Sequence, residues 1–179
     1  MLGVTRAAAR DRDCSNLCYC LAQAENLPFQ SGSFDGVACR LAAHHFRDVK
    51  SFLSESRRVL KPSGWLLIVD NVGIEQDEAD DELDRIEFLR DPSHVRSYRE
   101  STWAEMIAEA GFRVEFTETV PKPLNAQDWM TRMSVPEKTQ ETLVEIISGA
   151  SGWLREYLRP HGEGELLTFH LHEMLLLAR

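Results

Sequence analysis

Two neighbouring histidines and a later aspartate are the residues of this chain best suited to proton transfer. His44 and His45 stand side by side, and Asp70 follows an apolar run. A neutral imidazole or an ionised carboxylate accepts a proton at about pH 7, so either type could act as a general base. The alternative for the histidines is helix capping or packing, and for Asp70 it is capping of the following loop.

Further histidines lie downstream. His94, Arg96 and Tyr98 alternate in a polar stretch, which favours either contact with a substrate or a surface loop. His170 and His172 share one face of a predicted strand. A metal pair there would need a third ligand. Histidines whose hydrogen bonds are satisfied within the strand are therefore the simpler interpretation.

Four cysteines bear on metal binding and on the cellular compartment. Cys14, Cys18 and Cys20 stand close together, with Cys39 apart, and the residues before them do not form a signal peptide. The spacing C-x3-C-x-C lacks the paired C-x2-C arms of a zinc site. We therefore expect small core residues rather than metal ligands, and reduced thiols in the cytoplasm.

Three continuous apolar runs predict the strands that position these residues. They cover Asn16–Ala22, Phe34–Cys39 and Gly64–Val72. Continuous rather than alternating apolar residues are typical of strands that are covered on both faces of a parallel sheet. Helical spacing of the apolar residues from Val49 to Leu60 predicts a connecting helix, so the pattern indicates an α/β fold.

The second half of the chain predicts more helices than strands. Nine acids and two arginines between Glu75 and Asp91 mark an acidic helix, either a solvated face or a docking patch. Two S/T-x-x-E capping boxes, Thr102 with Glu105 and Ser134 with Glu137, predict helix starts. The further predicted elements are a helix ending at Gly111, a half-exposed strand over 112–117, helices near 126–133, 135–148 and 153–158, and a strand over 167–177.

Length and composition set the class of protein. The chain has 179 residues and 20.4 kDa, with 43% hydrophobic and 27% charged residues. These values fit one folded domain and exclude wholesale disorder, and the longest apolar runs are too short for a membrane span. A net charge of −9 repels phosphate backbones and anionic lipids, so nucleic acid is not expected as a partner.

The stretch from Ala24 to Val72 carries a specific resemblance. It contains A-E-x-L-P-F, S-F-D-x-V, L-A-x-H-H-F, R-V-L-K-P-x-G and a strand ending in D-N-V. These motifs resemble the type 11 family of class I S-adenosylmethionine-dependent methyltransferases, which includes the ubiquinone and menaquinone C-methyltransferases. Similar landmarks follow at D-P-S-H-V-R, A-G-F and D-W-M.

The resemblance implies a Rossmann-like sheet of order 3-2-1-4-5-7-6, with S-adenosylmethionine across the carboxyl ends of its first four strands. Gln23, Ala24 and Glu25 would border the adenine, and Arg40 and Leu41 the methionine part of the cofactor. His45 and Asp70 would be catalytic. The residues expected on the side of a small-molecule acceptor are His44, Asn71, His94, Arg96 and Tyr98.

The chain departs from the family pattern at two places. The glycine-rich G-x-G-x-G loop and the acidic strand end that follows it are missing, and Met1–Arg10 resembles the helix after the second family strand. We therefore expect a single N-terminally truncated methyltransferase domain over 1–179, with a helical insertion over 121–160. An Arg-rich transit peptide is the alternative for the first ten residues. Gln23 replaces the acidic residue that would accept a hydrogen bond from adenine.

These departures affect what we expect of cofactor binding and self-association, and they leave two alternative functions open. We expect weak cofactor binding by the chain alone, and self-association through an apolar sheet edge left without its neighbour. The chain is either a methyltransferase for a small acceptor or a noncatalytic relative that serves as a partner or regulator. A nicotinamide-dependent oxidoreductase would also need a glycine fingerprint and is excluded.

Overall fold

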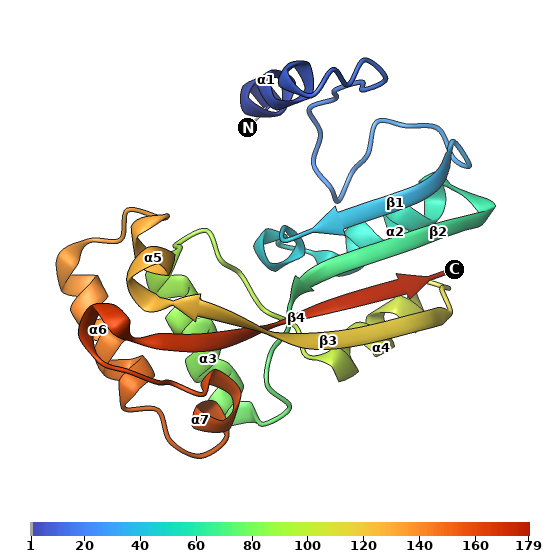
Figure 1. Ribbon diagram of the computed structural model, residues 1–179. Coiled ribbons are helices and arrows are strands. Elements are labelled where there is room, and N and C mark those ends of the chain that lie inside the picture. Colours follow the sequence, from blue (N-terminus) through green and yellow to red (C-terminus); the bar gives the residue numbers. More distant parts are fainter. Residues whose placement is uncertain (1) are drawn as a thin grey trace.

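A four-stranded mixed sheet forms the centre of the computed structural model, which describes residues 2–179 (Figure 1). The strands follow the order β1 (Phe34–Arg40), β2 (Leu60–Asn71), β4 (Thr168–Ala178) and β3 (Val114–Asn125). β1 and β2 are parallel, whereas β4 is antiparallel to both of its neighbours. This arrangement corresponds to the 4-5-7-6 part of the implied strand order, so the Rossmann-like α/β fold is confirmed.

Helices and short 3-10 turns connect the strands. They are α1 (Leu2–Asp11), η1 (Ala43–His45), α2 (Val49–Val59), α3 (Asp77–Arg90), α4 (Glu100–Glu109), α5 (Ala126–Thr131), α6 (Glu137–Ser148), α7 (Gly152–Leu158) and η2 (Gly164–Leu166). None of the helices formed by residues 2–179 combines the length and the hydrophobicity that a bilayer crossing requires.

The β1–α2–β2 unit follows the predicted pattern. Val37 is paired with Leu66, and Cys39 with Ile68, in the parallel register. Asp48 caps α2 because its Oδ1 accepts a hydrogen bond of 3.0 Å from the backbone N–H of Ser51. The unit therefore presents the carboxyl ends of β1 and β2 at one edge of the sheet.

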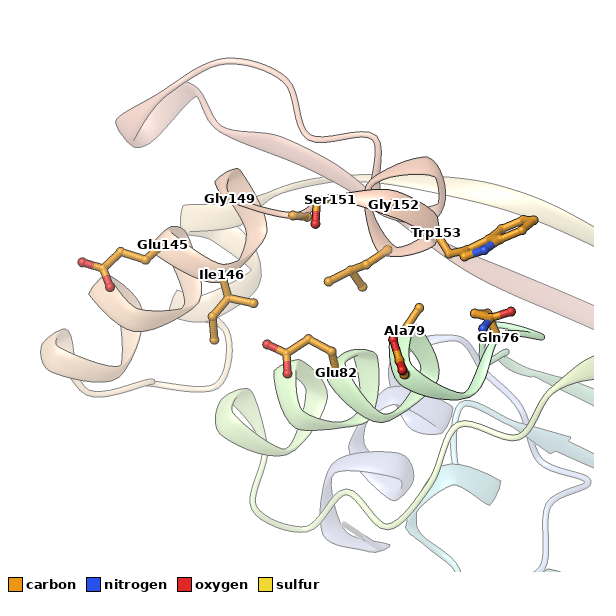
Figure 2. A pocket seen from close by; sticks show the side chains of 12 residues that line it. Gln76, Ala79, Glu82, Glu145, Ile146, Gly149, Ser151, Gly152 and Trp153 are labelled. Carbon is orange, nitrogen blue, oxygen red and sulfur yellow. The ribbon is translucent and has the colours of Figure 1, made fainter.

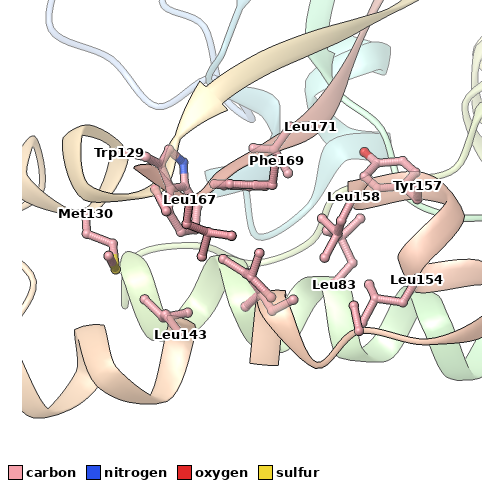
Figure 3. Close-up of a cluster of buried hydrophobic side chains, with 14 of the residues drawn as sticks. Leu83, Trp129, Met130, Leu143, Leu154, Tyr157, Leu158, Leu167, Phe169 and Leu171 are labelled. Atoms are coloured by element: carbon pink, nitrogen blue, oxygen red, sulfur yellow. The ribbon is translucent and has the colours of Figure 1, made fainter. Parts of the chain in front are cut away.

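Two apolar clusters hold the molecule together. One joins α2 and α4 to β1, β2 and the end of β4, with Leu53, Leu66 and Trp103 fully buried. The other lies among α3, α5, α6, α7 and the far half of the β3–β4 ribbon (Figure 3). In that second cluster Trp129 packs edge-on against Phe169, with ring centroids 5.0 Å apart.

The predicted strand at Asn16–Ala22 is wrong. These residues form no regular element, and Cys14, Cys18 and Cys20 are exposed rather than core residues. A short apolar run becomes a strand only where a neighbouring strand bonds to it, and within residues 2–179 β1 pairs with β2 alone. The predicted helix of the first ten residues is present as α1; Met1 lies outside the described residues.

Both predicted capping boxes are also wrong. α4 begins at Glu100 after the N-cap Arg99, three residues before the predicted cap Thr102. The Glu75 carboxylate accepts bonds from the backbone N–H of Ser101 (3.0 Å) and its hydroxyl (2.6 Å) at this start. α6 begins after Pro136 instead of Ser134, whose φ of 52° is left-handed. The start of α4 therefore depends on a carboxylate that is distant in sequence, and the start of α6 depends on a proline, rather than on the predicted local motifs.

The stretch over 121–160 combines strand and helices. Pro121 and Pro123 belong to β3, which is an edge strand where a missing N–H is tolerated. From residue 126 on, α5, α6 and α7 follow and carry much of the second cluster. α3 is also more than a solvated acidic face, because Asp80 and Glu87 are buried.

Candidate active site

The carboxyl ends of β1 and β2 meet at the turn that contains both histidines. Leu41 follows β1 with a φ of 48°, a left-handed backbone that a leucine adopts only when its surroundings hold it there. Its N–H donates to the carbonyl of Val69 on β2 at 2.8 Å. η1 comes next and turns His44 and His45 back over the sheet edge.

Asp70 is the residue that fixes this turn. It is 1% exposed, and its Oδ2 accepts hydrogen bonds from the backbone N–H groups of Ala43 (2.7 Å), Ala42 (3.2 Å) and His44 (3.3 Å). Its Oδ1 accepts from the backbone of Asn71 at 2.9 Å and lies 2.5 Å from Nδ1 of His44. With all these bonds Asp70 orients its neighbours, and its carboxylate does not line the cavity.

His44 is held by that carboxylate through one ring nitrogen. An ionised Asp70 accepts the bond, so Nδ1 carries the proton and Nε2 keeps its lone pair in the neutral ring. Burial acts most strongly and lowers the pKa of His44, but the hydrogen bond and charge of Asp70, with Glu87 and Asp91, outweigh it. The pKa is therefore raised above its ordinary value of 6.5.

His45 lies next to His44, with ring centroids 4.1 Å apart. Its Nδ1 is 3.0 Å from the carbonyl oxygen of Ser93, which accepts the bond, and its Nε2 is 4.0 Å from Asp91 Oδ2. This ring is less buried than that of His44, at 34% against 13% side-chain exposure. His45 is therefore the more accessible of the two imidazoles.

A cavity of about 380 Å³ opens in front of the two histidines, and we call it the His44 cavity. Two buried side-chain atoms on its wall, Asn71 Oδ1 and Glu87 Oε1, have no hydrogen-bond partner within residues 2–179. Buried polar atoms without partners are rare and suit a bound ligand. The cavity is lined by Leu41, His44, His45, Asn71, Glu87, Arg90, Asp91, Lys122, Leu124, Trp129, Arg132, Met133 and Leu171.

A second cavity, the Gln23 cavity, shares His45 with the first. It is lined by Gln23, Glu25 and the run from His45 to Asp48. Of the residues predicted on the cofactor side, Gln23 and Glu25 therefore lie together. Ala24 packs against the first apolar cluster, Leu41 lines the His44 cavity, and the exposed Arg40 lines neither cavity.

The three alternating candidates do not line either cavity. His94 is buried with Nε2 at 2.8 Å from Asp84, and Arg96 pairs with Asp80 (2.5 Å) and Asp84 (3.0 Å) on α3. Tyr98 packs against Trp103, with centroids 5.9 Å apart. The structure therefore gives His94 and Arg96 carboxylate partners that tie their segment to α3.

The wall residues Glu87, Arg90 and Lys122 were not among the predicted site residues. Arg90 and Glu87 lie on the last turns of α3, and Lys122 lies on β3, so no spacing signal near the histidines marks them. Trp129 and Met133 also line the His44 cavity.

Another cavity, of about 470 Å³, lies between α3 and the α6–α7 pair (Figure 2). It is lined by Glu78, Glu82 and Glu145 together with the 60% exposed Trp153. None of the predicted site residues borders it. The histidine turn therefore stays the better candidate for an active site.

Comparison with known proteins supports this assignment. The model of a methyltransferase domain family matches residues 1–68. The chain is 30% identical over 178 residues to the uncharacterized methyltransferase YcgJ of Bacillus subtilis, covering 98% of this chain and 70% of YcgJ. The crystal structure of YcgJ superposes with a TM-score of 0.92 over 99% of this chain and 77% of that one.

Two further relatives broaden the comparison. The uncharacterized protein YafE of Escherichia coli is 36% identical over 164 residues, which are 92% of this chain and 79% of YafE. A ubiquinone/menaquinone biosynthesis C-methyltransferase, UbiE of Rhizobium johnstonii, is 33% identical over 137 residues, which are 65% of this chain and 53% of UbiE.

Proposed function

Because this chain belongs to the type 11 family of class I S-adenosylmethionine-dependent methyltransferases, we propose that it methylates a small molecule bound in the His44 cavity. The observation that carries the proposal is the position of His45, which lines both the His44 cavity and the Gln23 cavity. The two cavities adjoin at His45, so the methyl group of a donor in one would have to meet the acceptor in the other beside this side chain.

The residues of the Gln23 cavity fit the cofactor. The amide oxygen of Gln23 can accept a hydrogen bond from an adenine amino group, and Glu25 can accept from ribose hydroxyls. S-adenosylmethionine, when bound, supplies a methyl group activated by a sulfonium centre. The chain contributes the walls that align the acceptor and exclude water.

His44 is the base of the proposed reaction. Asp70 holds Nδ1, so the Nε2 lone pair is free to take a proton from an acceptor hydroxyl or acidic carbon. The charge of Asp70 then stabilises the imidazolium that results, because the pair is buried from water. His45, the residue first predicted as catalytic, lies at the junction of the cavities and shapes the approach of the acceptor.

The acceptor is a small molecule in this proposal. A cavity of about 380 Å³ is within the ordinary size range of small-molecule sites and is lined by Trp129, Met133 and Leu171 beside its polar groups. UbiE acts in quinone biosynthesis, so quinols and phenols are natural first candidates. The exposed free thiols of Cys14, Cys18 and Cys20 support a cytoplasmic setting.

A methyl-transfer assay tests the proposal. The full chain is incubated with methyl-labelled S-adenosylmethionine at millimolar concentration and a panel of quinols, phenols, aromatic acids and amines, and label in the product is counted. We expect transfer to at least one hydroxylated acceptor. No transfer to any of them, together with no binding of S-adenosylhomocysteine in calorimetry, would contradict the proposed function.

Two histidine variants test the role of the base. H44Q should lower kcat/KM by about 10²- to 10⁴-fold without weakening S-adenosylhomocysteine binding, since a positioned base contributes that much. H161Q, which changes an exposed histidine outside both cavities, is the control and should keep full activity. Equal activity of H44Q and the wild type would remove His44 from the mechanism.

A further inference from the structure

Two arginines stand at the end of the His44 cavity that lies against α5. Arg90 is in the last turn of α3, and Arg132 is the C-cap residue of α5. A third cation of the wall, Lys122, is already paired with Glu173 at 3.1 Å. The two arginines are therefore the cations available to a ligand.

Arg90 is held in place by contacts that are not ion pairs. Its Nε donates to the backbone carbonyl of Trp129 at 3.1 Å, and its guanidinium carbon lies 4.7 Å from the centroid of the Trp129 ring. Neither contact is a carboxylate, and the Nη atoms have no partner among residues 2–179. Arg132 forms no ion pair within the same residues.

No carboxylate among residues 2–179 forms an ion pair with either arginine, although the charges of Glu87 and Asp91 on the same wall offset part of the charge of Arg90. Burial most of all raises the pKa of Glu87, and the charge of Arg90 acts against that rise. Asp91 is engaged by Ser93, whose backbone N–H and hydroxyl donate to it at 2.9 and 2.6 Å. Burial most of all, opposed by Glu87 and assisted by Arg132, lowers the pKa of Arg90, so the two guanidinium groups are close enough to repel.

From this arrangement we infer that the methyl acceptor carries an oxyanion, a carboxylate or a phosphate, which Arg90 and Arg132 bind. Two unpaired guanidinium groups in a protein of net charge −9 form a local site for an anion, and the planar fork of arginine suits such groups. The inference rests on the proposed function, since it describes the acceptor of the same cavity.

The rest of the cavity sets the shape of that acceptor. Trp129, Met133 and Leu171 supply apolar wall to the cavity that the arginines and the histidine turn also line. An acceptor with an anionic group at one end, an apolar or aromatic middle and a hydroxyl at the other end matches these walls. The hydroxyl would face Nε2 of His44.

Calorimetry with three matched probes tests the inference. The full chain, saturated with S-adenosylhomocysteine, is titrated with 4-hydroxybenzoate, 4-hydroxyphenyl phosphate and the neutral 4-hydroxybenzamide. We expect at least one anion to bind about tenfold more tightly than the amide, because each charge-assisted pair adds more than a kilocalorie per mole. The two anions distinguish a carboxylate from a phosphate acceptor.

Arginine variants locate the binding. R132Q, at an exposed position, should weaken the binding of the anionic probe about tenfold and leave the affinity for the amide probe unchanged. R90Q should do the same, with its melting temperature checked because Arg90 packs on Trp129. R155Q removes an exposed arginine outside the His44 cavity and should change nothing.

The inference is overturned if the amide binds as tightly as both anions, if no probe binds, or if R132Q leaves anion binding intact. These failures differ from failure of the proposed function. An enzyme that transfers labelled methyl groups to a neutral phenol and ignores the anions would keep its activity and lose only the anion site.

Discussion

A buried carboxylate at the end of β2 arranges the site. Asp70 gathers three backbone N–H groups of the turn after β1 and one ring nitrogen of His44. The same carboxylate thus holds the strained turn at Leu41 and selects the tautomer of His44. Asp70, which was expected to be catalytic, is placed by these bonds as a residue that orients His44.

The raised pKa of His44 gives a first prediction. In D70N the negative charge that opposes burial is lost and any remaining hydrogen bond is to a neutral amide, so the pKa of His44 should fall below that of the wild type. An NMR titration of the His44 Cε1–H resonance measures both values. D35N, which removes an exposed carboxylate of β1, is the control and should leave the titration unchanged.

The sign of the pH effect on stability follows from the same shift. The folded protein binds the His44 proton more tightly than the unfolded chain, so this proton stabilises the fold fully below the unfolded pKa of about 6.5. The stabilisation is lost as pH rises through the higher folded pKa. An unchanged His44 titration in D70N would contradict both statements.

At the residue scale, the position of a residue along a strand predicted whether it lies in the site. The side of a helix on which a residue lies could not be used in the same way. His44, His45, Leu41 and Asn71 follow β1 or β2, and strand ends meet at one edge, so their proximity was predictable. Arg90 reaches the cavity because of where α3 packs, which no local spacing encodes. Alternation at 94–98 suggested substrate contact, although His94 and Arg96 bond to carboxylates of α3.

At the scale of elements, α3 is tied to the segment before α4 by a buried ion-pair network. Asp80 is 1% exposed, and its Oδ2 lies 2.5 Å from Arg96 and 2.8 Å from Arg99. Its Oδ1 accepts from the backbone N–H of Ile74 at 2.8 Å. The network holds α3, and with it the Arg90 end of the His44 cavity, against the sheet.

Breaking this network should be costly. D80N removes the charge from a buried partner of Arg96 and Arg99, which keep Asp84 and Asp77 as partners, and should lower the free energy of unfolding by about 2–3 kcal/mol. D81N removes a 74% exposed carboxylate 3.4 Å from the same Arg96 and should cost at most about 1 kcal/mol. Urea unfolding compares the two variants, and equal losses would show that burial does not decide the energetics.

Long apolar elements were predictable, whereas their ends and one short strand were not. β1, α2, β2 and β4 follow from apolar runs that pair with a neighbouring strand or that form one apolar face of a helix. The run at Asn16–Ala22 has the same composition but no neighbour to bond with. Helix starts at Glu100 and Glu137 depend on Glu75 and Pro136, and the first of these contacts is distant in sequence.

At the scale of the whole molecule, one edge of the sheet is open within residues 2–179. β1 pairs with β2 alone, and Ala38 near its centre is exposed. We propose that a second copy of the chain adds across this edge, because unpaired backbone groups and apolar side chains together attract another strand.

Light scattering tests the proposed self-association. At tens of micromolar the average mass should exceed the monomer mass of 20.4 kDa and should fall on dilution. A monomer mass that does not change with concentration would contradict the proposal. The measurement is independent of any acceptor or cofactor.

The residues that line the candidate active site lie partly within the family match and partly beyond it. The matched residues 1–68 contain the two histidines and the whole Gln23 cavity, whereas Arg90 of α3, Lys122 of β3 and Arg132 at the end of α5 come later in the chain. On the proposed function, the residues assigned to the donor therefore lie within the family match, and those assigned to the anionic group of the acceptor lie beyond it. Exchange of residues 72–171 with those of a relative is on that basis expected to change the acceptor and to keep the donor.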